Sequence, residues 1–402
     1  MGAMLSIKSN DEDPRDLARR RDLWVVCHGQ KLIMRILNPE YERAADAGVP
    51  LSQSGYARGR GTTEQVFAAR LALEQQRNDQ GMLCIGYMDC GTFFMSCVKT
   101  VQAECERWMG VDPEVTKVVR ALHTAVTAQY ETAHGLTEEF DINTGNGQGC
   151  VNGAVRSKLQ LAVVQRAVDE LCKGYKYTGY KRVKQLIYAD DALYMTDNIA
   201  DLQLMFDTCW TMMTMMGLQI MIKGKKKTAF MATYWKDGKQ KNVDMGDVKM
   251  QLPDEREVPQ IRAAELDERD ETTRTQTTGT TNKKQTPQTV GGGKRKKKSQ
   301  QKTKDTAKTD TGKKTKNNVQ TYRYLGCELS PIPEVGYTRT RSEVCRQMTN
   351  IIRQIGRLPG LDNARMREVM EVAVQGIMGF YGRTTPFTWA DCEEIEKERA
   401  KG

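Results

Sequence analysis

Apolar side chains recur at helical spacing in several parts of the chain. Spacings of three or four residues predict helices at residues 66–73, 115–126, 155–163, 202–216 and 366–380. Thr62 and Thr63 precede the first helix and are expected to cap it, and Gly217 is expected to end the fourth. The methionines of the fourth helix lie on its apolar face, so we interpret them as core residues rather than ligands.

Short apolar runs of strand length lie between these helices. They cover residues 82–88, 185–189, 192–196 and 218–222, bounded by Asp, Gly or Lys, and a further run covers residues 324–329. Strands separated by helices, followed by a helical C-terminal part, predict an α+β fold.

Composition narrows the class of protein. The chain has 402 residues, of which 39% are hydrophobic, enough for a substantial core. No stretch approaches 18 apolar residues and no basic-then-apolar leader is visible, so we expect an intracellular protein without membrane spans. The 11 cysteines form no Cys-x-x-Cys pair, and there are only three histidines. The cysteines are therefore expected to be reduced and mostly buried, with neither a zinc knuckle nor a disulfide framework.

The positive charge is concentrated in one segment. Residues 271–318 hold 14 Lys/Arg against three Asp/Glu, which leaves 47 basic and 48 acidic residues elsewhere. Residues 264–318 contain almost no aliphatic side chains, so we expect a disordered basic insert. A nuclear-localisation signal or an RNA-binding patch is compatible with this composition, which leaves the nucleus or an organelle open as the location.

The most specific chemical signal is a pair of adjacent aspartates. Asp190 and Asp191 lie between two apolar runs, with no Gly or Asn to form a turn. Adjacent like charges are costly there unless a cation neutralises them, and Mg²⁺ prefers carboxylate oxygens. Asp89 ends another apolar run and is the candidate third ligand of a two-metal site for phosphoryl transfer. A simple charged turn is the alternative.

Six motifs in this order resemble the reverse transcriptases of non-LTR (LINE-type) retrotransposons, which are related to those of group II introns. The Tyr-Ala-Asp-Asp sequence at 188–191 resembles the family's catalytic hairpin. The other motifs are the fingers motif at 53–63, the first aspartate and sugar-sensing aromatic at 89–94, the Gln-Gly-Cys segment at 144–150, the Lys-Thr motif at 225–228 and the primer-grip Tyr-Leu-Gly at 324–326. The resemblance runs from about residue 21 to residue 382.

This resemblance implies a right-hand polymerase with fingers, a palm containing an antiparallel sheet, and a helical thumb. The expected divisions are the N-terminal part of the fingers at 1–80, the palm with remaining fingers elements and catalytic hairpin at 81–263, the basic insert at 264–318, a primer-grip-like end of the palm at 319–332 and a helical thumb-like region at 333–402.

The resemblance also implies residue roles. Asp89, Asp190 and Asp191 would be the catalytic residues and hold two Mg²⁺ ions, with Mn²⁺ as an alternative. The expected nucleotide-binding residues are Arg60, Phe94, Gln148 and Lys227, and the expected primer or template contacts are Tyr188, Gly149, Tyr324, Leu325 and Gly326. Phe94 would clash with a ribose 2′-hydroxyl, Arg60 would pair with phosphate, and Lys227 would neutralise or protonate the leaving pyrophosphate. For Arg60 and Lys227, a solvated surface position is the alternative.

The implied function is RNA-directed DNA polymerisation by a retroelement protein. Its partners would be an RNA template, a DNA primer or RNA–DNA hybrid, and dNTPs. No endonuclease motif is visible, so retrotransposition would require an endonuclease on another chain or in a longer parent protein. Ala57, Phe93, Met95 and residues 151–154 depart from the family pattern, so a catalytically silent RNA-binding relative is the second hypothesis. An RNA-dependent RNA polymerase is disfavoured, because Ala189 precedes the aspartate pair where Gly is usual and because Phe94 would hinder ribonucleotides.

Overall fold

The structure is a computed structural model. It describes residues 2–7, 20–124, 126–132, 135–147, 149–177, 182–222, 227–243, 249–261, 263–264, 319–355, 357 and 363–399. The chain forms one large unit of residues 1–262 and 320–402 and a second unit of residues 263–319, which contains β16 (Ala263–Ala264). Apart from Ala264, the predicted basic insert lies outside the described residues. No helix in the described ranges is long and apolar enough to cross a membrane.

A five-stranded antiparallel sheet forms the centre of the large unit. Its strands follow the order β10 (Gln185–Tyr188), β11 (Asp191–Thr196), β3 (Leu83–Met88), β12 (Ala229–Lys236) and β13 (Lys239–Asn242). All neighbouring pairs are antiparallel. β3 is therefore the central strand, and every one of its residues is buried.

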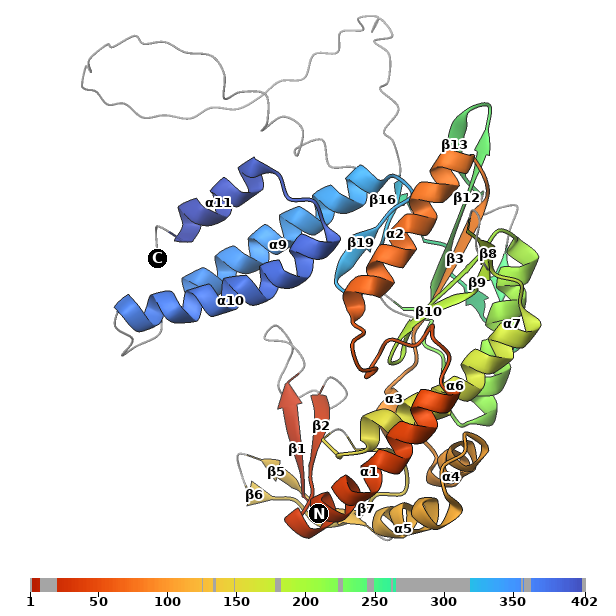
Figure 1. Ribbon diagram of the computed structural model, residues 1–402, viewed down its shortest axis with the longest axis vertical. Coiled ribbons are helices and arrows are strands. Elements are labelled where there is room, and N and C mark those ends of the chain that lie inside the picture. The colour runs from red at the N-terminus through yellow and green to blue at the C-terminus, as the bar shows by residue number, and fades with distance from the viewer. Residues whose placement is uncertain are drawn as a thin grey trace, which may run out of the picture. The chain divides into compact units, whose positions relative to one another are not determined.

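Alternate side chains of β3 pack into two different hydrophobic clusters, because successive residues of a strand point to opposite faces. Cys84 and Met88 join the cluster under α6 (Gly153–Leu171) and α7 (Ile199–Met215), whereas Leu83, Ile85 and Tyr87 join the cluster under α2 (Thr62–Asp79). α2 and α7 accordingly lie on opposite faces of the sheet (Figure 1). Burial on both faces explains why these strands appear in the sequence as continuous apolar runs.

Three other helices of the N-terminal half pack around α6 and one another rather than on the sheet. α1 (His28–Gly48) and α4 (Lys99–Trp108) contact α6, and α5 (Pro113–His123) contacts α1 and α4. The short helix α3 (Phe93–Ser96) also belongs to this part of the chain. A four-stranded sheet has the order β2 (Arg20–Val25), β1 (Gly2–Ile7), β5 (Tyr130–Thr132) and β6 (Gly135–Leu136). A two-stranded sheet is formed by β4 (Thr127–Ala128) and β7 (Phe140–Asp141).

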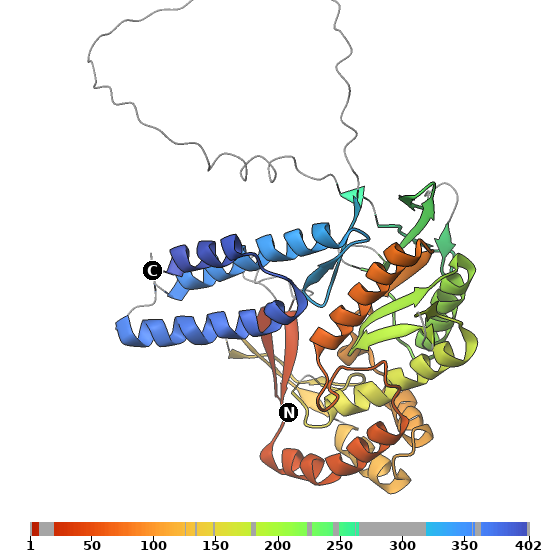
Figure 2. The ribbon, with the colours of Figure 1, turned by 45° about the horizontal axis from the view of Figure 1, so that its top comes forward.

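The C-terminal part begins with a small hairpin and continues as helices. β18 (Tyr322–Tyr324) pairs with β19 (Cys327–Leu329), and α9 (Pro333–Ile355) packs on β19. α9 also contacts α10 (Asn363–Thr384) and α11 (Trp389–Arg399), and these helices lie side by side in both views (Figure 2). The short strands not yet named are β8 (Tyr175–Lys176), β9 (Arg182–Val183), β14 (Met250–Gln251), β15 (Glu257–Val258) and β17 (Val319–Gln320).

The prediction of an α+β fold with an antiparallel sheet and a helical C-terminal part is confirmed. Each of the five predicted helices overlaps an observed helix, and Gly217 follows α7 with a φ of 75°. The expectation that the cysteines are mostly buried is also confirmed, since nine of the 11 are buried.

Several details of the prediction are wrong. The residue that caps α2 is Gly61, whose N–H donates to Glu64 Oε2 at 2.8 Å, and Thr62 and Thr63 are already helical. α5 ends at His123, three residues before the predicted end. Residues 218–222 form only an isolated bridge from Ile220 to Cys90, because β11 and β12 already occupy both edges of β3. The run at 324–329 is not one strand, since Leu325 and Gly326 form a turn between β18 and β19.

Candidate active site

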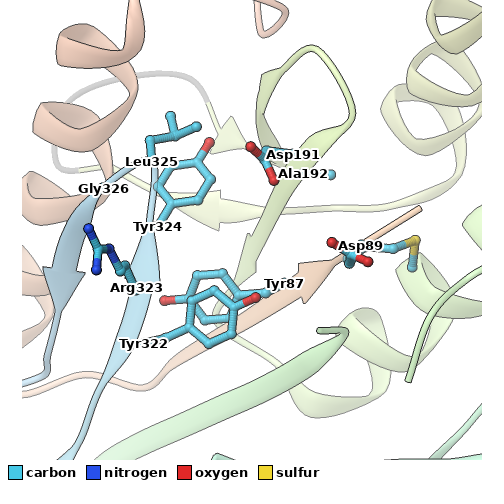
Figure 3. A pocket seen from close by; sticks show the side chains of 10 residues that line it. Tyr87, Asp89, Asp191, Ala192, Tyr322, Arg323, Tyr324, Leu325 and Gly326 are labelled. Carbon is cyan, nitrogen blue, oxygen red and sulfur yellow. The ribbon is translucent and has the colours of Figure 1, made fainter. Parts of the chain in front are cut away.

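Two of the three predicted aspartates lie at neighbouring strand ends, since Asp89 directly follows β3 and Asp191 is the first residue of β11. In the β3–β11 ladder, Met88 is opposite Ala192, so continuing the antiparallel register by one residue places Asp89 opposite Asp191. Both aspartates line one pocket of about 230 Å³ (Figure 3). The structure thus brings together two carboxylates that are about 100 residues apart in the chain.

Asp190 lies in the turn that joins β10 to β11. Tyr188 pairs with Asp191, so Ala189 and Asp190 form a two-residue hairpin turn. Ala189 has a φ of 57°, in the left-handed region that such turns require and that side chains other than Gly disfavour. Tyr188 is half-buried, and neither it nor Asp190 is among the residues that line the pocket.

Two aspartates and one cation, Arg323, line the pocket, and Lys227 contacts Asp89 without lining it. Partial loss of hydration, followed by the charges of Asp190 and Asp89, raises the pKa of Asp191 to about 6, and the positive charge of Lys227 opposes this shift. Lys227 Nζ lies 2.7 Å from Asp89 Oδ2, and the Asp89 N–H donates to Thr228 Oγ1 at 3.1 Å. The charges of Asp190, Asp89 and Lys227 therefore all act on Asp191.

The aspartate carboxylates of the site are chemically suited to bind Mg²⁺, because hard cations prefer carboxylate oxygens. The position also suits a metal ion, since Asp89 and Asp191 are opposite each other in the ladder and line the same pocket. Across the described ranges, however, no three Asp, Glu, His or Cys side chains form a group that could hold an ion as it stands. Asp89 and Asp191 therefore fit the metal, because Mg²⁺ is commonly held by one or two carboxylates together with water and substrate phosphate.

The β18–β19 hairpin forms the other side of the pocket. Its lining residues run from Tyr322 to Gly326, and the Tyr322 ring stacks on Tyr87 with centroids 3.7 Å apart (Figure 3). The Tyr324 hydroxyl is buried and donates to the Leu186 carbonyl at 3.0 Å, which ties the hairpin to β10.

The turn of this hairpin depends on unusual backbone angles. Leu325 and Gly326 have φ values of 46° and 87°. A Cβ added at Gly326 would lie 3.2 Å from Tyr381 Oη, so the position favours glycine for both conformation and space. The structure thus brings Tyr324, Leu325 and Gly326 to the same pocket as Asp89 and Asp191.

The nucleotide-binding candidates are more dispersed. Phe94 lies in α3, is half-buried, and makes an edge contact with Tyr56 at a centroid distance of 6.4 Å. Phe93, which departs from the family pattern, is 3% exposed and belongs to the main core cluster. Arg60 is exposed and donates to the Leu51 carbonyl at 2.8 Å. Gln148 lies outside the described residues.

The glycine-rich loop before α6 packs closely against its surroundings. Gly149 has a φ of 102°, and an added Cβ would lie 3.0 Å from the Trp24 carbonyl oxygen. Two backbone N–H groups of the loop donate to the α3 region, from Gly145 to the Cys97 carbonyl at 2.8 Å and from Asn146 to the Phe94 carbonyl at 2.7 Å. Backbone hydrogen bonds therefore join this loop to Phe94 and the end of α3.

Sequence reasoning missed some residues that build the site. Tyr87 could have been found, because it lies two residues before Asp89 and so shares its face of β3. Gln53 was seen only as part of a motif, yet it is 1% exposed and hydrogen bonds to Ala189 in the aspartate turn. Nothing in the local pattern marks the buried pair of Glu106 and Arg156, because its partners come from different helices.

No family model and no curated protein matches this sequence. Among solved structures, the fold is similar to apo telomerase from Candida tropicalis truncated from its C-terminal domain, at 11% identity and a TM-score of 0.36, over 53% of this chain and 45% of that one. It is also similar to an RdRp complex, at 9% identity and a TM-score of 0.41, over 60% of this chain and 21% of that one. An RNA polymerase complex inside a dsRNA virus matches at 10% identity and a TM-score of 0.37, over 60% of this chain and 22% of that one. The chain spans less than half the length of each of these proteins, and the likeness concerns the fold alone.

Proposed function

We propose that the chain is an RNA-directed DNA polymerase that adds dNTPs to a primer 3′-hydroxyl. The observation that carries this proposal is the pocket shared by Asp89, Asp191 and the β18–β19 hairpin. Carboxylates from neighbouring strands, facing an aromatic hairpin across an open pocket, suit a reaction that joins a nucleic-acid end to a triphosphate.

Each residue then has a definite task. Mg²⁺ held by Asp89 and Asp191, with Asp190 as a further ligand, would activate the 3′-hydroxyl and offset the charge of the triphosphate. Lys227 pairs with Asp89 at 2.7 Å and would supply positive charge beside the leaving pyrophosphate. Tyr324, Leu325 and Gly326 would position the primer end, and Phe94 with Tyr56 would form an apolar surface under the incoming sugar.

The wider assignments belong to the same proposal. The central sheet would be the palm, the helices around α6 the fingers, and α9 to α11 the thumb. The sequence motifs indicate a non-LTR retroelement as the source, with an RNA template and a DNA primer as partners. The basic residues between 271 and 318 would add contacts to phosphate.

The decisive experiment is primer extension on an RNA template with Mg²⁺, comparing the parent with Asp190→Asn. We expect the substitution to abolish extension while the circular dichroism spectrum is unchanged, because removing one negative charge from the turn relieves repulsion. Asp237→Asn is the matched control, since Asp237 is an exposed aspartate in the other hairpin turn of the same sheet, with a φ of 55°. Extension by Asp190→Asn at the parent rate would refute the two-metal assignment.

A catalytically silent nucleic-acid-binding protein is the second candidate. One observation favours it: Lys227 pairs with Asp89, and the described residues include no preassembled group of three metal ligands. This candidate predicts that the parent binds RNA but extends no primer with either Mg²⁺ or Mn²⁺. Extension that depends on Asp190 would eliminate it.

A further inference from the structure

We propose that Gln53 is a positioning residue that holds the aspartate turn in its working conformation, an inference that rests on the proposed function. The Gln53 side chain is 1% exposed and meets both polar groups of Ala189. Its Nε2 donates to the Ala189 carbonyl at 3.2 Å, and its Oε1 accepts from the Ala189 N–H at 3.0 Å. The same Oε1 accepts from the Gly55 N–H at 2.8 Å.

The turn has a specific need for such a partner. Ala189 adopts a φ of 57°, a left-handed conformation in which a Cβ comes too close to the following carbonyl oxygen. Strained conformations of this kind persist only where surrounding contacts over-determine them. A side-chain amide has donors and an acceptor in fixed geometry, so one Gln side chain can satisfy both groups of Ala189.

The backbone of Gln53 is itself fixed to the sheet. The Ser54 N–H donates to the Ile187 carbonyl at 2.8 Å, and the Ile187 N–H donates to the Ser52 carbonyl at 2.9 Å. These bonds make a parallel bridge between Gln53 and Ile187 beside the edge strand β10. Gln65 of α2 donates to the Ser52 carbonyl at 3.1 Å, which anchors the segment to the helix as well.

Gly55 brings the next part of the chain into contact with the turn. A Cβ added at Gly55 would lie 2.1 Å from the Ala189 nitrogen, so only glycine permits this approach. The chain then continues to Tyr56, whose ring meets Phe94, and on to Arg60. The loop that carries Arg60, one of the nucleotide-binding candidates, is therefore joined to the aspartate turn through Gln53 and Gly55.

The consequence for catalysis follows from chain order. Asp190 and Asp191 come directly after Ala189, so the orientation of the Ala189 peptide sets the direction of the following carboxylates. Groups that orient metal ligands without touching the metal commonly change metal affinity or activity by about 10–100-fold when they are replaced. Gln53 would act in this way on the aspartates rather than on the substrate.

The test compares Gln53→Met with Gln76→Met. Methionine is close to glutamine in size but cannot make these hydrogen bonds. Gln76 is a matched control, because it is also fully buried and donates to a backbone carbonyl, that of Gly81 at 2.8 Å, at the far end of α2. Gln53→Asn is the second variant, since it keeps a polar amide but is one methylene too short to reach Ala189.

Three measurements separate positioning from a purely structural role. We expect Gln53→Met to raise the Mg²⁺ concentration for half-maximal primer extension by about 10–100-fold, with little change in the KM for dNTP. Hydrogen exchange at the Ala189 amide should become faster, while exchange in β3 stays slow. The rise in Tm caused by Mg²⁺ should become smaller, because weaker binding to the native state stabilises it less.

Each possible result of these measurements either supports or overturns the positioning role of Gln53. If Gln53→Met and Gln76→Met lose activity equally and keep the parent's Mg²⁺ dependence, Gln53 is only structural and the inference is wrong. If Gln53→Met does not fold, Gln53→Asn must give the same shifts, and unchanged values for it also overturn the inference. If the parent extends no primer, the proposed function fails by itself. Hydrogen exchange and the Mg²⁺-dependent Tm then decide the role of Gln53 alone.

Discussion

A buried ion pair beneath the glycine-rich loop gives the sharpest test of the packing around α6. Arg156 Nε of α6 lies 2.6 Å from Glu106 Oε1 of α4, with side chains 3% and 0% exposed. The Tyr41 hydroxyl of α1 donates to the other carboxylate oxygen at 3.1 Å. One carboxylate therefore joins three helices, and Arg156→Met would leave it buried without its cation.

The expected loss of stability is large. Removing one partner of a buried pair costs about 3–5 kcal/mol, because the remaining charge is left without compensation. For a protein of this size, that loss corresponds to a fall in Tm on the order of 5 °C. The same substitution at Arg166, which is half-buried on the same helix and donates to the Gly48 carbonyl at 2.8 Å, should cost only about 1–2 kcal/mol.

The variant should also acquire a characteristic pH dependence. Burial already raises the pKa of Glu106 above its usual value of 4.5, and the charge of Arg156 opposes that rise. Without Arg156, the pKa of Glu106 in the folded protein rises further above 4.5. The Arg156→Met variant should therefore be most stable below about pH 4.5 and lose stability as the pH rises above that value. The parent protein, which keeps Arg156, should lose less stability over the same rise in pH.

The assay is thermal unfolding followed by circular dichroism between pH 5 and 8. A Tm for Arg156→Met that falls steadily with rising pH, and is partly restored in the double variant Glu106→Gln/Arg156→Met, would agree with the expectation. The reasoning would be refuted by an Arg156→Met variant that loses less than the Arg166→Met control and has the parent's pH profile.

Three further predictions concern the sugar contact, a buried histidine and the basic segment. Phe94→Ala should lower the ratio of kcat/KM for dNTPs to kcat/KM for rNTPs by roughly 10–100-fold. An unchanged ratio would mean that another residue selects the sugar, though not Phe93, which is buried. Burial and the charge of Arg156 lower the pKa of His123 to about 3, so the parent should lose stability as the pH falls from about 6.5 towards 3. His123→Gln should reduce this slope by up to about 1.4 kcal/mol per pH unit in chemical unfolding, and equal slopes would contradict it. Deleting residues 271–318 should leave the circular dichroism spectrum of the core unchanged but weaken the salt dependence of RNA binding. The slope of log affinity against log salt concentration should fall by about 0.7 for each phosphate contact that is lost. Superimposable salt titrations of the two proteins would contradict a role of this segment in binding.

The sequence by itself determined the periodic elements and the chemical character of the site. Helices such as α7 and strands such as β3 could be predicted because burial imposes a spacing of three to four residues on one and a continuous apolar run on the other. The adjacent aspartates at 190 and 191 could be singled out because their electrostatic cost is local and needs no knowledge of the fold.

Not every strand of the central sheet was predicted from the sequence. The β12–β13 hairpin was missed, although 229–236 is rich in aromatic and β-branched residues, and residues 218–222 were assigned as a strand in its place. Both segments follow α7 and both carry apolar side chains. Only the position beside β3, where Met231 pairs with Ile85, distinguishes the real strand.

Tertiary structure alone decided which side chains meet. The alignment of Asp89 with Asp191 depends on the register of β3 against β11, and a shift of one residue would turn the side chains to the opposite face. The contact of Gln53 with Ala189, and that of Arg156 with Glu106, join residues 136 and 50 positions apart. Local spacing carries no information about such contacts, because they form only when separate elements are packed together and their buried polar groups must find partners.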